Sequence, residues 1–106
     1  MNYRNSKISL ITTGSATLTV KIQVSYQEKV PDFTSASSPT NHWVYGGSYD
    51  IDPWTFIAGS TGVSASGTDI NKILVVNENN PRWINLEVSG YSAGTVYAFI
   101  TANNNI

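Results

Sequence analysis

The chain contains few side chains that could perform acid–base or nucleophilic chemistry. A serine nucleophile needs a base within reach, most often a histidine, and a third group that orients this base. The lone histidine, His42, lies beside a serine-rich stretch, and Asp32 or Asp50 could complete a triad on paper. No Gly-x-Ser-x-Gly turn supports such a triad. Seven acidic residues in 106 also leave little room for the carboxylate pair that a glycosidase needs. We therefore expect no catalytic residues and no enzyme activity.

Asp50 and Asp52, in the segment Tyr-Asp-Ile-Asp-Pro, are the candidates for metal ligands. Both would point the same way from an extended backbone, and Asp32 could approach them, which would offer the oxygen ligands that calcium prefers. The alternative is that they cap a turn, because Asp side chains often accept hydrogen bonds from their own backbone. The absence of cysteine excludes disulfides and cysteine-bound zinc. We expect turn caps, no metal and no cofactor.

Aromatic residues are the stronger binding candidates. One group lies in the segment 42–57 and could form a platform on which sugar rings stack: Trp43, Tyr45, Tyr49 and Trp54. The competing interpretation is that Trp54 and Phe56 belong to the core, since large aromatic side chains dominate small β cores. A second group follows near the C-terminus: Trp83, Tyr97 and Phe99. This group forms either a protein interface with a hot-spot cluster or, if a strand or loop covers it, a second part of the core.

The elements that must position these residues are predicted by the alternation of apolar and polar side chains. The clearest strand spans residues 16–26, with one apolar side made of Leu18, Val20, Ile22, Val24 and Tyr26. A shorter strand is expected over 7–12, with a turn at 13–15 between the two. Short strands are expected near 43–45 and 54–57, a linker over 59–68, and a central strand buried on both faces over 70–76.

The C-terminal third is predicted to form a β-hairpin. Two alternating segments, 83–88 and 96–101, flank a short loop bounded by glycines. If residue 89 pairs with residue 95, Glu87 faces Tyr97 and Asn85 faces Phe99, with Trp83 diagonal to Phe99. This pairing would place the three aromatic side chains side by side on one face.

Composition agrees with an all-β fold. Serine, threonine and asparagine, which are poor helix formers, number 13, 11 and 11, while charged residues make up only 12%. We expect a single antiparallel β-sandwich of about seven or eight strands, with a jelly-roll-like arrangement as one option. Residues 1–106 would form one domain with a long surface loop at about 28–41.

Several segments resemble a pattern in small β-sandwich structural proteins of tailed bacteriophages. The segment Arg-Trp-Ile-Asn-Leu-Glu-Val from Arg82, followed by Tyr-Ser-Ala-Gly-Thr-Val from Tyr91, is similar to the strand, Ser/Thr-x-Gly-Thr turn and Val-rich final strand of those proteins. The segment 14–22 and Trp54-Thr-Phe-Ile occupy similar places in that layout, whereas the loop at 28–41 and the aromatic segment after it resemble an insertion.

The resemblance implies a non-enzymatic virion protein, made in the host cytoplasm and built into the phage particle. The first expectation is a capsid decoration or cement protein that forms homo-oligomers and contacts the major capsid protein or other virion proteins. The alternatives are a carbohydrate-binding, lectin-like module and a tail or fibre-associated module. A net charge of −1 and the lack of a long apolar run favour neither nucleic acid nor membrane as a partner.

Overall fold

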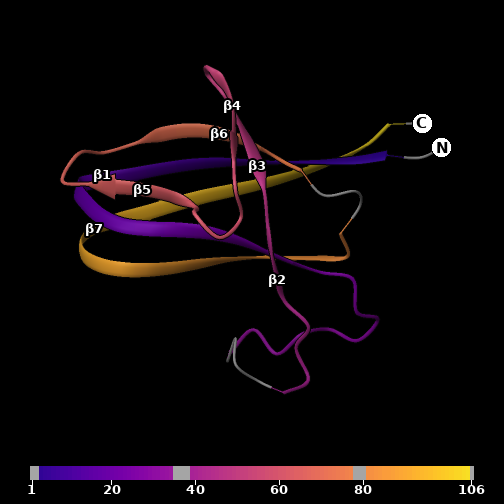
Figure 1. Ribbon diagram of the computed structural model, residues 1–106. Helices are drawn as coiled ribbons and strands as arrows, with labels where there is room; N and C mark the ends of the chain where they lie inside the picture. Colours follow the sequence, from indigo (N-terminus) through magenta and orange to yellow (C-terminus); the bar gives the residue numbers. More distant parts are fainter. Residues whose placement is uncertain (1–2, 35–38, 78–80, 106) are drawn as a thin grey trace.

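The computed structural model of the protein describes residues 3–34, 39–77 and 81–105 (Figure 1). The described residues form seven strands and no helix: β1 (Tyr3–Ser25), β2 (Val44–Gly46), β3 (Ser48–Ile51), β4 (Trp54–Ile57), β5 (Val63–Ser66), β6 (Asn71–Val76) and β7 (Trp83–Asn105). All paired strands run antiparallel and belong to one sheet. The expected all-β antiparallel fold and its number of strands are confirmed.

The sheet is folded over along its two longest strands. β1 and β7 pair with each other over nearly their whole lengths, and both turn back near the middle, so that the two termini lie side by side (Figure 1). We call residues 3–13 of β1, residues 95–105 of β7 and strands β6, β3 and β4 the first half. The second half comprises residues 17–25 of β1, residues 83–89 of β7, and strands β5 and β2.

The fold-over of β1 lies at Gly14 and Ser15, whose φ angles are 79° and 53°. The carboxylate of Asp69 holds this bend from outside the strand: it accepts hydrogen bonds from the Ala16 N–H at 3.0 Å, the Ser15 N–H at 3.3 Å and the Thr12 hydroxyl at 3.3 Å. These bonds, chiefly the one from Ala16, hold the pKa of Asp69 below its usual value. Hydrogen bonds to one carboxylate therefore stabilise the bend.

The predicted C-terminal hairpin is wrong. Residues 83–105 form one strand, and both parts of it pair with β1, so that Glu87 lies opposite Lys21, Tyr97 opposite Ile11 and Phe99 opposite Ser9. Gly90 and Gly94, at φ 61° and 94°, mark the bend of β7 rather than a hairpin loop. The predicted turn at 13–15 is likewise the bend of one continuous strand. Two alternating segments separated by glycines can form either a hairpin or one bent strand. Here they form one bent strand, because both segments pair with β1.

The core lies between the two halves. Alternate residues of β1 face it on both sides of the bend, as predicted for the strand 16–26. The buried apolar residues are Ile8, Leu10, Ala16, Leu18, Val20, Ile22, Val24, Val63, Ala65, Leu74 and Val76. Tyr26 departs from the prediction, because β1 ends at Ser25 and the tyrosine is exposed.

Two expectations for the middle of the chain need correction. β6 lies between β1 and β3, but only one of its faces is buried: Leu74 and Val76 point into the core, whereas Ile73 is 42% exposed. The predicted linker over 59–68 contains β5, which pairs with residues 17–20 of β1. The Gly and Ser residues around β5 made this segment resemble a linker, although its small side chains Val63 and Ala65 are buried.

Candidate functional site

The outer face of the first half is lined mainly by apolar side chains. Directly paired residues of adjacent strands share a face, so the register places Phe99, Ser9 and Ile73 in one row across β7, β1 and β6. A second row joins Val75, Tyr49 and Phe56 across β6, β3 and β4. We call the apolar part of this surface the outer apolar face, and its members are Ile11, Tyr49, Phe56, Ile73, Val75, Tyr97 and Phe99. The same register places Lys7, Ser9 and Asn71 among them, and Lys7 and Asn71 are exposed.

Most of the large side chains on this face reach solvent. Phe99 is 62% exposed, and Tyr97 and Phe56 are each 51% exposed. Trp54, at the start of β4, is 63% exposed and stacks on Tyr49 with ring centroids 4.9 Å apart and planes at 12°. Isolated exposed apolar residues are ordinary, but several on one sheet face are typical of a surface that binds a partner.

The outer face of the second half is different because polar groups cover it. The Tyr45 hydroxyl donates to a Glu87 carboxylate oxygen at 3.0 Å, and Asn85 Nδ2 donates to Gln23 Oε1 at 2.8 Å. The Lys21 ammonium lies 5.2 Å from the centre of the Tyr45 ring. The hydrogen bond to Glu87 raises the pKa of the Tyr45 hydroxyl above its usual value. This face is suited to water rather than to an apolar partner.

Trp83 does not lie beside Tyr97 and Phe99. It is half-buried in the second half, where its Nε1 donates to the Gln27 carbonyl at 2.9 Å and Phe33 packs against its ring at a centroid distance of 6.4 Å. Phe33 belongs to the predicted long loop, of which residues 35–38 lie outside the described residues. The alternative that this loop covers an aromatic residue applies to Trp83, and the predicted row of three aromatic side chains is reduced to two.

The predicted sugar platform is also divided. Trp43 contacts Phe33 in the loop, with ring centroids 5.7 Å apart, and Tyr45 lies on the polar outer face of the second half. Only Tyr49 and Trp54 come together. The prediction that Trp54 and Phe56 belong to the core is wrong, since both are more than half exposed.

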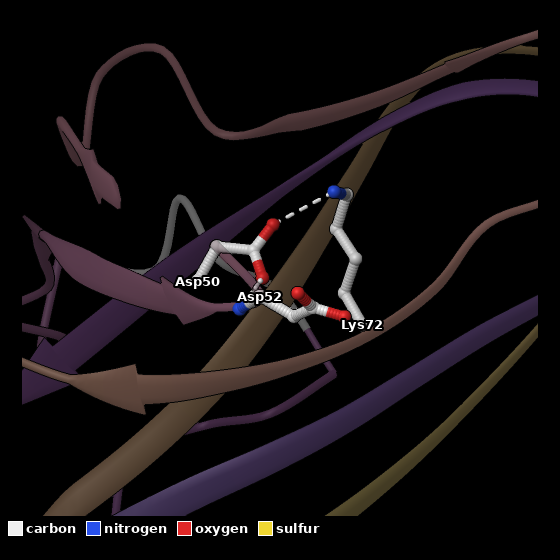
Figure 2. Close-up of polar contacts among 3 residues, drawn as sticks. All are labelled: Asp50, Asp52 and Lys72. Atoms are coloured by element: carbon white, nitrogen blue, oxygen red, sulfur yellow. Dashed lines mark hydrogen bonds and ion pairs between the residues drawn. The ribbon is translucent and has the colours of Figure 1, made fainter. Parts of the chain in front are cut away.

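Asp50 and Asp52 lie at the end of β3 (Figure 2). Asp50 is only 6% exposed, and its Oδ2 lies 2.8 Å from the Lys72 ammonium of β6. Its Oδ1 accepts a hydrogen bond from the Asp52 N–H at 3.1 Å, which is the expected turn cap. These contacts, above all the one with Lys72, hold the pKa of Asp50 below its usual value. The ammonium neutralises the carboxylate that a cation would need.

The residues proposed for a triad or a cation site are not brought together. The Asp32 carboxylate accepts hydrogen bonds from the hydroxyl and, with a smaller effect, the backbone N–H of Thr34, and both lower the pKa of Asp32. Asp50 pairs with Lys72. His42 is exposed, and its backbone N–H donates to Gln27 Oε1 at 2.8 Å. Within the described ranges, no three acidic or histidine side chains group as metal ligands would. The polar residues thus stabilise the loop and turns.

The arrangement of the outer apolar face combines residues from both predicted aromatic groups, Tyr97 and Phe99 from one and Tyr49 from the other. Sequence reasoning missed its aliphatic members Ile73 and Val75, because a continuous apolar segment predicts burial on both faces. It also missed Ile11, because the predicted strand 7–12 was not assigned an outward side. Comparisons of the chain with known protein families, with curated proteins and with solved structures give no match. In the part of the chain that the structure describes, no helix has the length and apolar character to cross a membrane.

Proposed function

We propose that this protein is a non-enzymatic structural component of a phage virion, and that it binds a neighbouring virion protein through the outer apolar face. The observation that carries the docking proposal is the contrast between the two outer faces. One presents exposed aromatic and aliphatic side chains, and the other presents a hydrogen-bonded polar network. Such a contrast orients a protein on a lattice, because only one face gains from burial.

The gain from burying this face is substantial for so small a protein. An aromatic side chain offers roughly 200 Å² of accessible surface, so the exposed parts of Tyr97 and Phe99 amount to about 100 Å² each. At about 25 cal/mol per Å², each contributes about 2 to 3 kcal/mol before the costs of association. A low charge density adds little repulsion between closely packed copies. These properties support a capsid decoration or cement role, with the major capsid protein as the partner.

The virion assignment itself rests on the resemblance of the strand segments at 82–96 to phage structural proteins, and a tail or fibre position is its variant. The test is to purify phage particles from the strain that encodes the chain and to search for the protein in their capsid and tail fractions. A protein that stays entirely outside the particles contradicts the assignment. Its presence in tails alone selects the tail or fibre variant.

The docking surface is tested by rebinding purified protein to particles that lack it. The double variant Ile73→Ser with Phe99→Ser is expected to lose binding, because it removes the two apolar side chains of one row of the outer apolar face, on the edge strand β7 and on β6. Tyr45→Ser is the matched control, since it removes an exposed aromatic ring from the opposite face. Equal binding by the two folded variants would refute docking through this face.

Carbohydrate binding is retained as a second candidate because of one feature. The Trp54 ring is 63% exposed while Tyr49 stacks on it and fixes its orientation, as in a sugar-stacking platform. Titration with soluble glycans, followed by tryptophan fluorescence, tests this function. Quenching that Trp54→Ala abolishes would favour it over a purely protein-binding role, and unchanged fluorescence across the glycans would exclude those ligands.

A further inference from the structure

The backbone of β7 forms a long free edge of the sheet. β7 pairs with β1 on one side, and no other described strand pairs with it. Natural proteins usually protect such edges with charged side chains, especially lysine, or with proline. From Val88 to Thr101 this strand contains no charged residue and no proline. The edge is thus open to another strand. Its exposed side chains include Tyr97 and Phe99 on the outer face and Ile100 on the core-facing side.

The sequence of this edge is symmetric about Ala98. Residues 95–101 read Thr-Val-Tyr-Ala-Phe-Ile-Thr, so each position has a residue of the same class at the mirrored position. Two copies aligned antiparallel about a twofold axis at Ala98 would pair threonine with threonine, valine with isoleucine and tyrosine with phenylalanine. Aromatic and β-branched cross-strand pairs of this kind stabilise antiparallel strands. A twofold interface requires just this self-complementarity.

We propose that two copies of this chain form a dimer by pairing residues 95–101 of β7 across a twofold axis at Ala98. In this register Tyr97 of each copy lies opposite Phe99 of the other, and Val96 lies opposite Ile100. The pairing joins the first halves of both copies into one continuous sheet and extends the outer apolar face across the axis. The proposal does not depend on the virion assignment or on what the outer apolar face binds.

Charge and size are compatible with a second copy as the occupant. Repulsion between like charges usually prevents two identical strand edges from pairing. The segment 88–101 carries no charge, so this repulsion does not arise here. Seven paired residues form an interface well below the roughly 800 Å² per partner of a standard complex. The dimer is therefore weak and reversible, with dissociation in the micromolar range, and copies held close together on a surface would favour it.

The oligomeric state tests the proposal directly. Sedimentation velocity of the full chain over about a hundredfold range of concentration should show a monomer–dimer equilibrium. Phe99→Lys should weaken dimerisation by about tenfold or more, because it replaces both symmetric aromatic pairs. Ser89→Lys is the matched control on the same strand, in the second half and outside the paired segment. Circular dichroism confirms that both variants fold, as expected for exposed positions.

The register is tested separately through disulfide formation, which is unambiguous because the chain has no cysteine. Directly opposite Cβ atoms are about 5 Å apart, so Ala98→Cys should form a covalent dimer under mild oxidation. Ser64→Cys, exposed on β5, should not.

A protein that stays monomeric at all concentrations overturns the proposal. A dimer that is insensitive to Phe99→Lys, or that forms no disulfide through Ala98→Cys, also overturns it. The single variant Ile73→Ser distinguishes the dimer from docking to particles: it lies outside the paired segment, so it should weaken particle binding and leave the dimer intact.

Discussion

The bend of β7 at Gly94 leads to the most specific prediction about folding. A Cβ atom built on Gly94 would lie 2.5 Å from the Ala16 Cβ and 2.7 Å from the Thr13 carbonyl oxygen. Both neighbours belong to the bend of β1, so neither can move without disturbing the fold-over of the sheet. Gly90 is the matched control, because it also has positive φ, at 61°, but nothing lies within 4 Å of its added Cβ.

The expected effects of Gly94→Ala and Gly90→Ala follow from these distances. A non-glycine residue at positive φ costs about 1 to 2 kcal/mol, and this cost applies to both variants. Gly94→Ala adds an overpacking cost of about 1 to 3 kcal/mol, so its total destabilisation is about 2 to 5 kcal/mol. With about 5 °C of Tm per kcal/mol in a domain of this size, Tm should fall by about 5 to 10 °C for Gly90→Ala. The corresponding fall for Gly94→Ala is about 10 to 25 °C.

Urea unfolding followed by circular dichroism, together with thermal scans, measures both variants against the wild-type protein. The decisive quantity is the difference between the two free energies of unfolding. If Gly94→Ala and Gly90→Ala destabilise the protein equally, the close approach of β7 to Ala16 does not exist in solution. The reasoning that places the two bends against each other would then be refuted.

Three further predictions concern the core, an ion pair and the loop. Leu10→Ala should cost about 2 to 5 kcal/mol in urea unfolding, because Leu10 is fully buried between the halves; a cost below 1 kcal/mol would contradict that burial. The lowered pKa of Asp50 means that its ion pair with Lys72 contributes stability above the ordinary carboxyl pKa of 3.8 and loses it as pH falls through the lower folded value. Tm should therefore fall less steeply below about pH 4 in Lys72→Met than in the wild-type protein, and parallel curves would argue against the pair. Trp83→Phe should lose the bond to the Gln27 carbonyl and about 1 kcal/mol of stability, with faster proteolysis in the loop; unchanged proteolysis would show that Trp83 does not anchor it.

Local patterns predicted the strands well where one face is buried and the other solvated. The alternation over 16–26 identifies the inward residues of β1, and the strand at 54–57 agrees with the prediction. The linker prediction over 59–68 failed because small side chains such as Ala65 can fill the core beside a bend without an obvious apolar pattern. The prediction that β6 is buried on both faces failed, because an apolar segment shows only that its side chains are hydrophobic. It does not show whether a second layer covers the outer face of the strand.

The candidate site was predictable only in part. Tyr97 and Phe99 were recognised as outward-facing from alternation alone, and their exposure agrees. Trp83 was grouped with them because a hairpin would have brought residues 83 and 99 together. Its indole instead lies under the loop. β7 pairs with β1 on both sides of the bend, so residues 83 and 99 lie in different halves of the fold.

The sequence by itself determined the all-β class, the inward and outward sides of the longest strands and the short supply of residues for metal or acid–base chemistry. These properties follow from residue type and the period of two along an extended chain. Only the tertiary structure decided which outward residues share a surface. Neighbours across a sheet depend on which strands pair and in what register, and that choice is made by hydrogen bonding and burial over the whole chain. For this reason the aromatic residues of β7, β3 and β4 form one face with the aliphatic residues of β1 and β6.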